Sequence, residues 1–583
     1  MSAAVFDLDA LPPHVRVLVS GGGPSGLVCA LELAHRGIPS LVVEPRVGVD
    51  PNRPRAKTTN ARTMTHLRRL GLADALRAAA PLSADYSETV IFCSHLLGFE
   101  VRRFEHAFQL HRERYELQPE AGQQVAQPIV EEVLRAAVVA SPLITFATGL
   151  SVTSVDGRAV TVATPASTEP GRAREVTADF IVGADGSGSA VRRSLGIALQ
   201  GGSAARSNLN VLFRSPGLAE RVALDDAVQY WVMAPGASGI IGRADLDDTW
   251  WAIIQGVDVT APDLDPVALV RTMVGADVAV DVIATDPWTA RMLLAEHYGS
   301  GTSAGGSFLV GDAAHLNPPW GGHGFNTCVA DAVNLAWKIA AGIQGWAGEA
   351  LLDSYELERR PVAARTISDA ANNGGRLAND FADAVLGVDS AAGEALRAAA
   401  HDALEVKRSE FSSLGLVLGY SYADSPIVAR EPGAAPAEDP ITYVPSAHPG
   451  MLLPHGWLAD GRSVYDLLVD TGFTLLVDAR TALDARQPLD GLESPHGVPV
   501  TVVELDAPAL FDLWGAPAVL VRPDQHVAWR GSSLADVPAA LDLAAGWGAA
   551  AEPAAAEPGA TETAAPEAAA ATAAPALTHG ARR

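Results

Sequence analysis

The chain has 583 residues, of which 48% are hydrophobic and 19% charged, a length and composition that suit two to four globular domains. Its formal net charge of −26 argues against nucleic acid and anionic membrane surfaces as partners, because polyanions bind basic patches. The three cysteines lack metal-ligand or disulfide spacing, and no apolar stretch reaches the ~18 residues of a membrane span, so we expect a cytoplasmic protein that binds neither metal nor membrane.

The first predicted unit follows a short N-terminal extension, residues 1–14. Residues 15–19 predict an apolar strand, residues 27–36 a helix that stops at Gly37, and residues 40–44 a second strand. Between the first strand and the helix stand three glycines with the spacing GxGxxG: Gly21, Gly23 and Gly26. A glycine motif inside a complete β-α-β unit indicates a dinucleotide-binding fold.

Each glycine of this motif has a separate physical task. Gly21 permits the tight turn, Gly23 lets the backbone approach a pyrophosphate, and Gly26 lets helix and strand pack closely. Glu44 ends the second strand, where its carboxylate is expected to accept hydrogen bonds from the adenosine ribose hydroxyls.

The next stretches predict further helices and strands. An amphipathic helix passes through Leu67 and Leu70, and apolar residues at helical spacing predict another over 128–139. Short apolar runs between 141 and 182 predict strands, the last of which runs into Gly183-Ala184-Asp185-Gly186. Asp185 then lies at the carboxyl edge of a sheet, where ligands of α/β folds bind.

Residues 206–299 alternate apolar segments with Pro, Gly and Asp turns, a pattern that predicts antiparallel strands. Most large aromatic residues in such strands belong to the core, and a minority line a pocket. The candidates are Tyr230, Trp231, Trp250 and Trp251.

Residues 307–338 combine a buried strand, a Gly-rich loop and a helix. The strand around Phe308 ends at Gly311-Asp312, the loop contains Pro318-Pro319-Trp320-Gly321-Gly322, and an apolar face indicates a helix from about Phe325. A helix N-terminus after such a loop presents free backbone N–H groups and a positive dipole end to an anionic or polar ligand.

The remaining third of the chain divides by composition. Residues 351–361 carry carboxylates and arginines that we expect to form a helix-capping and ion-pair network, and residues 362–428 are predicted to be helical throughout. A Pro- and Ala-rich linker follows, and beyond it strands alternate with turns and helical stretches. The Ala, Pro, Glu and Thr composition after about Ala549 predicts a disordered tail.

The three motifs around Gly21, Asp185 and Asp312 stand in an order that resembles the single-component FAD-dependent aromatic hydroxylases, the family of p-hydroxybenzoate and phenol hydroxylases. The last folded segment is similar to the thioredoxin-like C-terminal domain of the larger phenol and polyketide hydroxylases, although it contains no cysteine for thiol chemistry. The implied fold class is α/β (α+β), with a Rossmann-like FAD-binding domain, an inserted antiparallel-sheet substrate domain and a C-terminal thioredoxin-like domain.

The resemblance also implies domain boundaries. The extension is followed by an FAD-binding domain (15–205 and 300–375), a substrate-binding sheet domain (206–299 with parts of 79–120), a helical segment (376–429), the linker (430–449), the thioredoxin-like domain (450–546) and the tail (547–583).

FAD is the implied cofactor. Pro24 and Ser25 inside the glycine motif are common in FAD-binding relatives, Arg55 is placed near the FAD phosphates or flavin, and Gln127 matches a glutamine that contacts FAD, with helix capping as its alternative. Asp312 is expected to hold a ribityl hydroxyl, and the loop after it to cup the flavin ring. The full expected set is Gly21, Gly23, Pro24, Ser25, Gly26, Glu44, Arg55, Gln127, Asp185, Arg192, Gly311, Asp312, Gly322, Gly324, Phe325 and Asn326.

The family's reaction is implied as well. NAD(P)H, bound transiently, reduces FAD, O2 adds to the reduced flavin, and a flavin hydroperoxide hydroxylates an aromatic substrate, phenolic or an aromatic polyketide. The catalytic candidates are Pro319, whose carbonyl would accept the substrate hydroxyl, together with Trp320 and Tyr230 as pocket residues. Trp320 and His323 depart from the commonest loop residues and either shape the pocket or pack. A monomer or a homodimer is expected.

Other functions stay open at this point. A Baeyer–Villiger oxygenation would use the same cofactor motifs, a dehydrogenase or oxidase would reduce FAD by its substrate, and a ligand-sequestering flavin-binding protein would not turn over. The substrate is also open, because a basic pocket would favour carboxylated phenols and a broad aromatic pocket polycyclic ones. The basic candidates are Lys57, Arg214 and Arg243, and Lys57 stands near the position where some relatives have an aspartate that helps to deprotonate the phenol.

Overall fold

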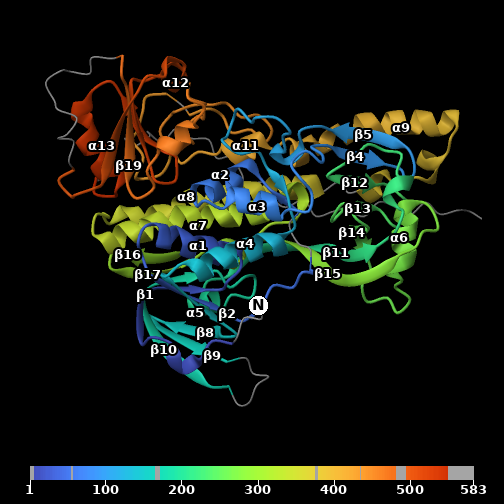
Figure 1. Ribbon diagram of the computed structural model, residues 1–583, viewed down its shortest axis with the longest axis horizontal. Coiled ribbons are helices and arrows are strands. Elements are labelled where there is room, and N and C mark those ends of the chain that lie inside the picture. The colour runs from blue at the N-terminus through green and yellow to red at the C-terminus, as the bar shows by residue number, and fades with distance from the viewer. Residues whose placement is uncertain are drawn as a thin grey trace, which may run out of the picture. The chain divides into compact units, whose positions relative to one another are not determined.

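The computed structural model describes residues 5–53, 57–164, 171–374, 378–433, 435–480 and 494–548. Three large sheets and the helices between them form one compact unit that ends at Gly548 (Figure 1). The mixed α/β fold class is as predicted. Among the helices of the described ranges, none is long and apolar enough to cross a membrane.

The first sheet is built on parallel strands, in the order β16-β17-β10-β1-β2-β7. Its parallel members are β1 (His14–Ser20), β2 (Ser40–Glu44), β7 (Ile144–Thr148), β10 (Ala173–Gly183) and β17 (Gly305–Leu309). The antiparallel additions are β8 (Ser151–Asp156), β9 (Ala159–Ala163) and β16 (Gly299–Thr302). The carboxyl ends of β1, β2, β10 and β17 therefore meet at one edge.

Helices α1 (Pro24–His35) and α7 (His323–Gln344) pack against each other and against this sheet. Helix α1 begins at Pro24, earlier than the predicted Leu27, because proline at the first helical turn costs no hydrogen bond. The neighbouring helices are α4 (Gln127–Ala140), which packs on α1, and α8 (Ala350–Gly374), which packs on α7. Shorter elements nearby are β3 (Thr58–Thr59), β6 (Gln123–Gln124), α2 (Ala61–Arg69), α3 (Ala73–Ala79) and α5 (Ala190–Ser194).

The second sheet has the order β18-β15-β11-β14-β13-β12-β4-β5. Its strands are β4 (Val90–Cys93), β5 (Glu100–Phe104), β11 (Leu199–Arg214), β12 (Gln229–Val232), β13 (Gly239–Arg243), β14 (Thr249–Val257), β15 (Asp281–Ala295) and β18 (His315–Leu316). The predicted antiparallel arrangement holds except between β12 and β4, which run parallel because they come from separate segments rather than from a hairpin. Helix α6 (Pro266–Val274) packs on one face.

The other face of this sheet packs against α9 (Ala391–Ala403) and α10 (Arg408–Phe411). The short helix α11 (Leu414–Leu418) follows and packs on Leu452 instead. The prediction of helix throughout 362–428 is wrong at residues 382–383, 388–390 and 412–413, and again after Leu418, where the chain runs through Gly419 and Pro426 in irregular conformation.

The C-terminal sheet has the order β20-β19-β21-β22. Its elements are β19 (Phe473–Asp478), β20 (Val500–Leu505), α12 (Pro508–Trp514), β21 (Ala518–Val521), β22 (Val527–Gly531) and α13 (Val537–Ala544). Apolar residues of this sheet pack on Trp337 and Ala341 of α7, so α7 lies between the first sheet and the C-terminal sheet (Figure 1). The predicted tail lies outside the described residues except for Trp547 and Gly548.

A buried ion-pair network joins the C-terminal sheet to α7 and α8. Arg522 donates to both carboxylate oxygens of Glu358, at 2.7 and 2.8 Å, and to Asp524 at 2.6 Å. Lys338 of α7 donates to Glu358 at 2.7 Å. The ion-pair network predicted for residues 351–361 is therefore present, and these residues lie within α8, which continues to Gly374.

Replacing Arg522 by methionine should cost about 3–5 kcal/mol of unfolding free energy, because Glu358 and Asp524 would remain buried side by side. Urea denaturation measures this. The matched control is Arg462→Ala, which removes an exposed ion pair with Asp460 and should cost less than about 1 kcal/mol. Equal costs for the two variants would contradict the assigned role of the network.

The same network predicts an acid dependence. Burial alone would raise the pKa of Glu358, but Arg522 and Lys338 outweigh it and hold the pKa at about 2. Because the folded pKa lies below the unfolded one, the contribution is complete above about pH 4.3 and is lost as the pH falls toward 2. Urea midpoints measured between pH 5 and 2.5 should fall more steeply in the native protein than in Arg522→Met, and parallel curves would contradict the assignment.

Candidate cofactor pocket and active site

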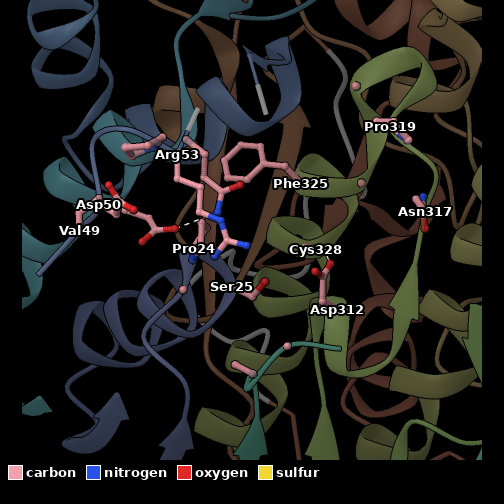
Figure 2. Close-up of a pocket in the computed structure, with 18 of the residues that line it drawn as sticks. Pro24, Ser25, Val49, Asp50, Arg53, Asp312, Asn317, Pro319, Phe325 and Cys328 are labelled. Atoms are coloured by element: carbon pink, nitrogen blue, oxygen red, sulfur yellow. Dashed lines mark hydrogen bonds between the residues drawn. The ribbon is translucent and has the colours of Figure 1, made fainter. Parts of the chain in front are cut away.

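A cavity of about 590 Å³ opens at the carboxyl edge of the first sheet, between the starts of α1 and α7. This is the edge at which open α/β sheets bind ligands. Figure 2 shows the side chains that surround it, with Pro24 and Ser25 of α1 on one side and Asp312, Asn317, Pro319 and Phe325 on the other. Gly23, Gln127, Gly186, Gly322 and Gly324 also line it.

The three glycines of the motif differ in what surrounds them. At Gly21, which has φ +105°, a Cβ would lie 2.3 Å from the Ala184 carbonyl oxygen, and at Gly26 a Cβ would lie 2.0 Å from the Gly21 oxygen. At Gly23, a Cβ would meet no atom of the described residues within 4 Å. Gly21 and Gly26 are therefore required by the protein's own packing, whereas Gly23 keeps backbone accessible from the cavity, as a phosphate-binding turn requires.

Two helices begin at this cavity without a capping side chain. Gly23 is the N-cap of α1 and Gly322, with φ +66°, is the N-cap of α7, and no side chain of the described residues accepts from either first turn. The unbonded N–H groups and the positive end of each helix dipole face the cavity. Such a pair of termini fits a ligand with a phosphate and a second polar part, as FAD has.

One side of the cavity carries a chain of polar contacts around Arg46 and Glu131. Glu44 accepts from the Gly22 backbone N at 2.6 Å and from the Arg46 Nε at 2.6 Å. Arg46 also pairs with Glu131 at 3.2 Å, and Gln127 donates to Glu131 at 2.8 Å. Gln127 lines the cavity, together with Arg46 and Glu131, whereas Glu44 is buried beside Arg46 and is not among the residues that line it. Arg46 and Glu131 were missed, although Arg46 closely follows Glu44 and Glu131 stands one helical turn after Gln127.

Asp185 has a different position from the one expected. Its Oδ2 accepts from the backbone N of Ala190 and Val191 at 2.8 and 3.2 Å, so it caps α5, and its neighbours Ala184 and Gly186 line the cavity in its place. Arg192 donates to the carbonyl oxygens of Ala313 and Ser187 at 3.0 and 2.9 Å and ties two turns of the pocket together. Asp185 and Arg192 therefore support the turns that form the cavity wall, without lining the cavity themselves.

The Gly311-Asp312 turn lies directly against α1. Gly311 has φ +61°, and a Cβ there would lie 2.4 Å from the Ser25 hydroxyl. The exposed Asp312 carboxylate lines the cavity, 3.6 Å from the Cys328 Sγ (Figure 2). Burial raises the pKa of the Cys328 thiol well above its ordinary value, so this cysteine stays protonated.

The loop before α7 divides its residues between the cavity and the core. Pro319, Gly322, Gly324 and Phe325 line the cavity. Trp320 instead packs beside Gly374, where a Cβ would lie 2.7 Å from its ring. The Asn326 side chain holds the loop by two hydrogen bonds. It accepts one from the Asn60 backbone N at 3.0 Å and donates one to the Gly322 carbonyl oxygen at 2.8 Å.

Tyr230 is not brought to this site. Its hydroxyl donates to the Asp225 carbonyl at 2.9 Å, and its ring belongs to the cluster on the α6 face of the second sheet. Burial raises the pKa of this phenol, so it does not supply a proton base. Side chains alternate along a strand, and it is the neighbouring Trp231 that faces the Trp320 side. The prediction of Tyr230 as a catalytic residue is therefore wrong, and Arg55 lies outside the described residues.

The face of the second sheet that includes Trp231 also carries Trp251 and Trp288, by strand alternation and register. The Trp288 Nε1 donates to the Asn210 side chain at 2.8 Å. The Lys57 ammonium lies 4.7 Å from the centre of the Trp251 ring. We call this set, Lys57, Asn210, Trp231, Trp251 and Trp288, the inner aromatic face.

His315, Asp331 and Arg359 form a buried ion-pair network at the Gly311 turn, which sequence reasoning missed. His315 contacts Asp331 at 2.8 Å, Asp331 accepts from Arg359 at 2.8 Å, and Asp331 also accepts from the Gly311 N at 3.2 Å. Burial alone would lower the pKa of His315, but Asp331 outweighs it and raises the pKa. The sequence signal that could have revealed this network is Asp331, a carboxylate within an otherwise apolar helical stretch.

Comparison with known proteins identifies the family. A family model for an FAD binding domain matches residues 14–370, and one for the C-terminal part of aromatic-ring hydroxylases matches residues 446–551. The chain is 33% identical to the FAD-dependent monooxygenase apdD of Emericella nidulans over 89% of this chain and 88% of that one. It is 32% identical to a putative polyketide hydroxylase of Streptomyces halstedii, over 89% of this chain and 93% of that one.

Among solved structures, RebC soaked with chromopyrrolic acid and with 7-carboxy-K252c bound matches with a TM-score of 0.82 and 32% identity, over 92% of this chain and 100% of that one. The predicted FAD cofactor is thereby confirmed at the level of the family, and the cavity and its glycines fit it. The chain belongs to the FAD-dependent aromatic-ring hydroxylases and is a flavoprotein monooxygenase.

Proposed function

We propose that this flavoprotein uses NAD(P)H and O2 to hydroxylate a broad aromatic substrate with an acidic hydroxyl, of the aromatic polyketide type. The observation that carries the proposal is the inner aromatic face, whose indole rings lie on the Trp320 side of the second sheet. Bound FAD supplies the reduction of O2 and the transfer of one oxygen atom, while the protein positions the ring and excludes water.

The distribution of basic residues supports this substrate class. Arg214 is exposed at the end of β11, and Arg243 donates to the carbonyl oxygens of Asp245 and Asp247 at 3.0 and 2.9 Å. By strand alternation Arg214 shares the face of Trp251, but it is exposed at the strand end, and Lys57 is the candidate that contacts an indole ring there. Lys407 lies 5.0 Å from the centre of the Trp231 ring, but it is paired with Glu410 at 2.6 Å. A cation beside indole rings suits a hydroxyl that ionises to a phenolate, whereas a carboxylated ligand favours paired guanidinium groups.

Several residue roles follow as part of the proposal. The Pro319 carbonyl accepts the substrate hydroxyl at the flavin edge, and Trp320 fixes the loop by packing. The free N–H groups of Ser25 and Gly26 hold the FAD pyrophosphate, Glu44 holds the adenosine ribose, and Asp312 the ribityl chain. At the start of α7, Gly324, Phe325 and Asn326 offer backbone N–H groups to the polar edge of the ring. NAD(P)H binds transiently, because FAD occupies the one GxGxxG motif of the sequence.

NAD(P)H oxidation by the FAD-loaded protein, followed by absorbance with a panel of phenols and polycyclic phenolic compounds, tests the reaction. We expect strong stimulation by a polycyclic phenol and a product that gains one oxygen atom from 18O-labelled O2 in mass spectrometry. A ligand that perturbs the flavin spectrum yet leaves NAD(P)H untouched would contradict the proposal and favour a sequestering protein. Insertion of oxygen into a carbon–carbon bond of the product would favour a Baeyer–Villiger outcome.

A pair of glycine variants tests the proposed phosphate turn. Gly23→Ala should leave the unfolding free energy of the apoprotein nearly unchanged, because its Cβ meets open space, and should weaken FAD binding roughly tenfold. Gly26→Ala should instead destabilise the apoprotein, because its Cβ would collide with the Gly21 oxygen. Urea denaturation and flavin fluorescence titration separate the two effects. Unchanged FAD affinity in Gly23→Ala would show that the pyrophosphate does not bind at this turn.

Lys57→Met tests the proposed contact with an ionised hydroxyl. A nearby cation favours the phenolate, so its loss should raise the pKa of a bound phenolic ligand by about one unit, and kcat/KM should fall roughly tenfold at neutral pH. Absorbance titration of the bound ligand measures the pKa directly. Arg214→Met is the matched control, since Arg214 is exposed at the end of β11, and it should change neither quantity. An unshifted ligand pKa in Lys57→Met would rule out the contact.

A further inference from the structure

A second, small cavity lies behind the first turn of α7. Its volume is about 30 Å³, and it lies where α2, α7, α8 and α11 meet. Its polar lining includes Arg62 and His66 of α2, His323 at the start of α7, and Arg359 and Thr366 of α8. His323 is the residue that opens the helix at the cofactor pocket, so this cavity lies directly behind the proposed flavin contacts.

Three buried polar atoms at this cavity have no hydrogen-bond partner within the described residues: the Arg62 Nε, the His66 Nδ1 and the His323 Nε2. The side chains are 4%, 3% and 5% exposed, so bulk water does not satisfy them. The other guanidinium nitrogens of Arg62 are engaged, with the Gln525 side chain and the Asp524 carbonyl. Buried polar groups in native proteins are almost always paired, which indicates a small ligand at this place.

The chemistry of these atoms selects the ligand. Burial lowers the pKa of His323 to about 4, and burial together with Arg62 and Arg69 lowers that of His66 far below its ordinary value, so both imidazoles are neutral. A neutral imidazole offers an acceptor nitrogen, and the Arg62 Nε–H is a donor. An anion only accepts hydrogen bonds, so both imidazoles would have to be protonated to bind it. The positive charges of Arg62 and Arg359 at the same cavity disfavour that protonation. One water has the matching pattern of one acceptor and two donors, and the cavity exceeds the ~10–15 Å³ that one water needs.

We propose that this cavity is a binding site for one ordered water, which accepts from the Arg62 Nε and donates to the His66 Nδ1 and the His323 Nε2. His323 is then a positioning residue: the water ties the first turn of α7 to α2, and through Arg62 to Gln525 and Asp524 of the C-terminal sheet. The inference is independent of NAD(P)H and of the substrate, and it rests on the proposed function in one respect, the place of the flavin at the start of α7.

The test is a high-resolution crystal structure of the substrate-free FAD complex, together with FAD dissociation constants for three variants. We expect one water peak within hydrogen-bond distance of the three atoms. His323→Phe, which removes the acceptor and fills the space, should lose the peak and weaken FAD binding roughly five- to tenfold. His323→Gln, which retains an acceptor, should restore most of the affinity.

Thr366→Val is the matched control. Thr366 lines the same cavity, but its hydroxyl donates to the Val362 carbonyl at 2.8 Å, so the variant should keep both the water and the FAD affinity. Absence of the peak in the native complex, a halide in its place, or an equal loss of affinity in Thr366→Val and His323→Phe would each overturn the proposal. A protein that shows the water yet fails to hydroxylate any phenol would leave this inference standing and count against the proposed function alone.

Discussion

Helices α1 and α7 begin at the same cavity with first-turn N–H groups that no described side chain caps. Uncapped helix ends beside a cavity are costly unless a ligand accepts from them, and two positive dipole ends attract the same anionic or polar partner. The packing of α1 on α7 fixes the distance between these ends. Three features keep these two helix starts at a fixed separation and leave their N–H groups accessible to FAD: the glycines, the turns behind them and the neighbouring helices.

Buried charge holds α7 in place from two sides. Asp331 links α7 to the Gly311 turn, to His315 and to Arg359, while Lys338 links α7 to Glu358 and thereby to Arg522 of the C-terminal sheet. Because each carboxylate has cationic partners, its charge is tolerated away from water. The C-terminal sheet contains no cysteine, and its observed contribution is this contact, with Trp337 and its apolar neighbours packed beside it.

Local sequence patterns were sufficient for the β-α-β unit, because strand, glycine turn and helix are set by residues close together in the chain. The bounds of β2 were predicted to the residue, and the glycine tasks follow from the backbone alone. Tyr230 was misplaced because alternation tells which residues share a face but not which face α6 covers. The hydrogen bond of Asp185 to Ala190 and the packing of Trp320 beside Gly374, one of the two roles left open for it, depend on how separate elements pack. The contact of Arg62 with Gln525 joins distant segments, and periodicity carries no signal for it.

Amide hydrogen exchange with and without FAD tests the central claim most directly, because it reports on the N–H groups themselves. The account predicts that FAD slows exchange in the first turns of both α1 and α7, at Ser25, Gly26, Gly324 and Phe325, by roughly tenfold or more, as hydrogen-bonded amides require. Protection confined to one of the two helix starts, or unchanged exchange at both in a protein that has bound FAD, would contradict it.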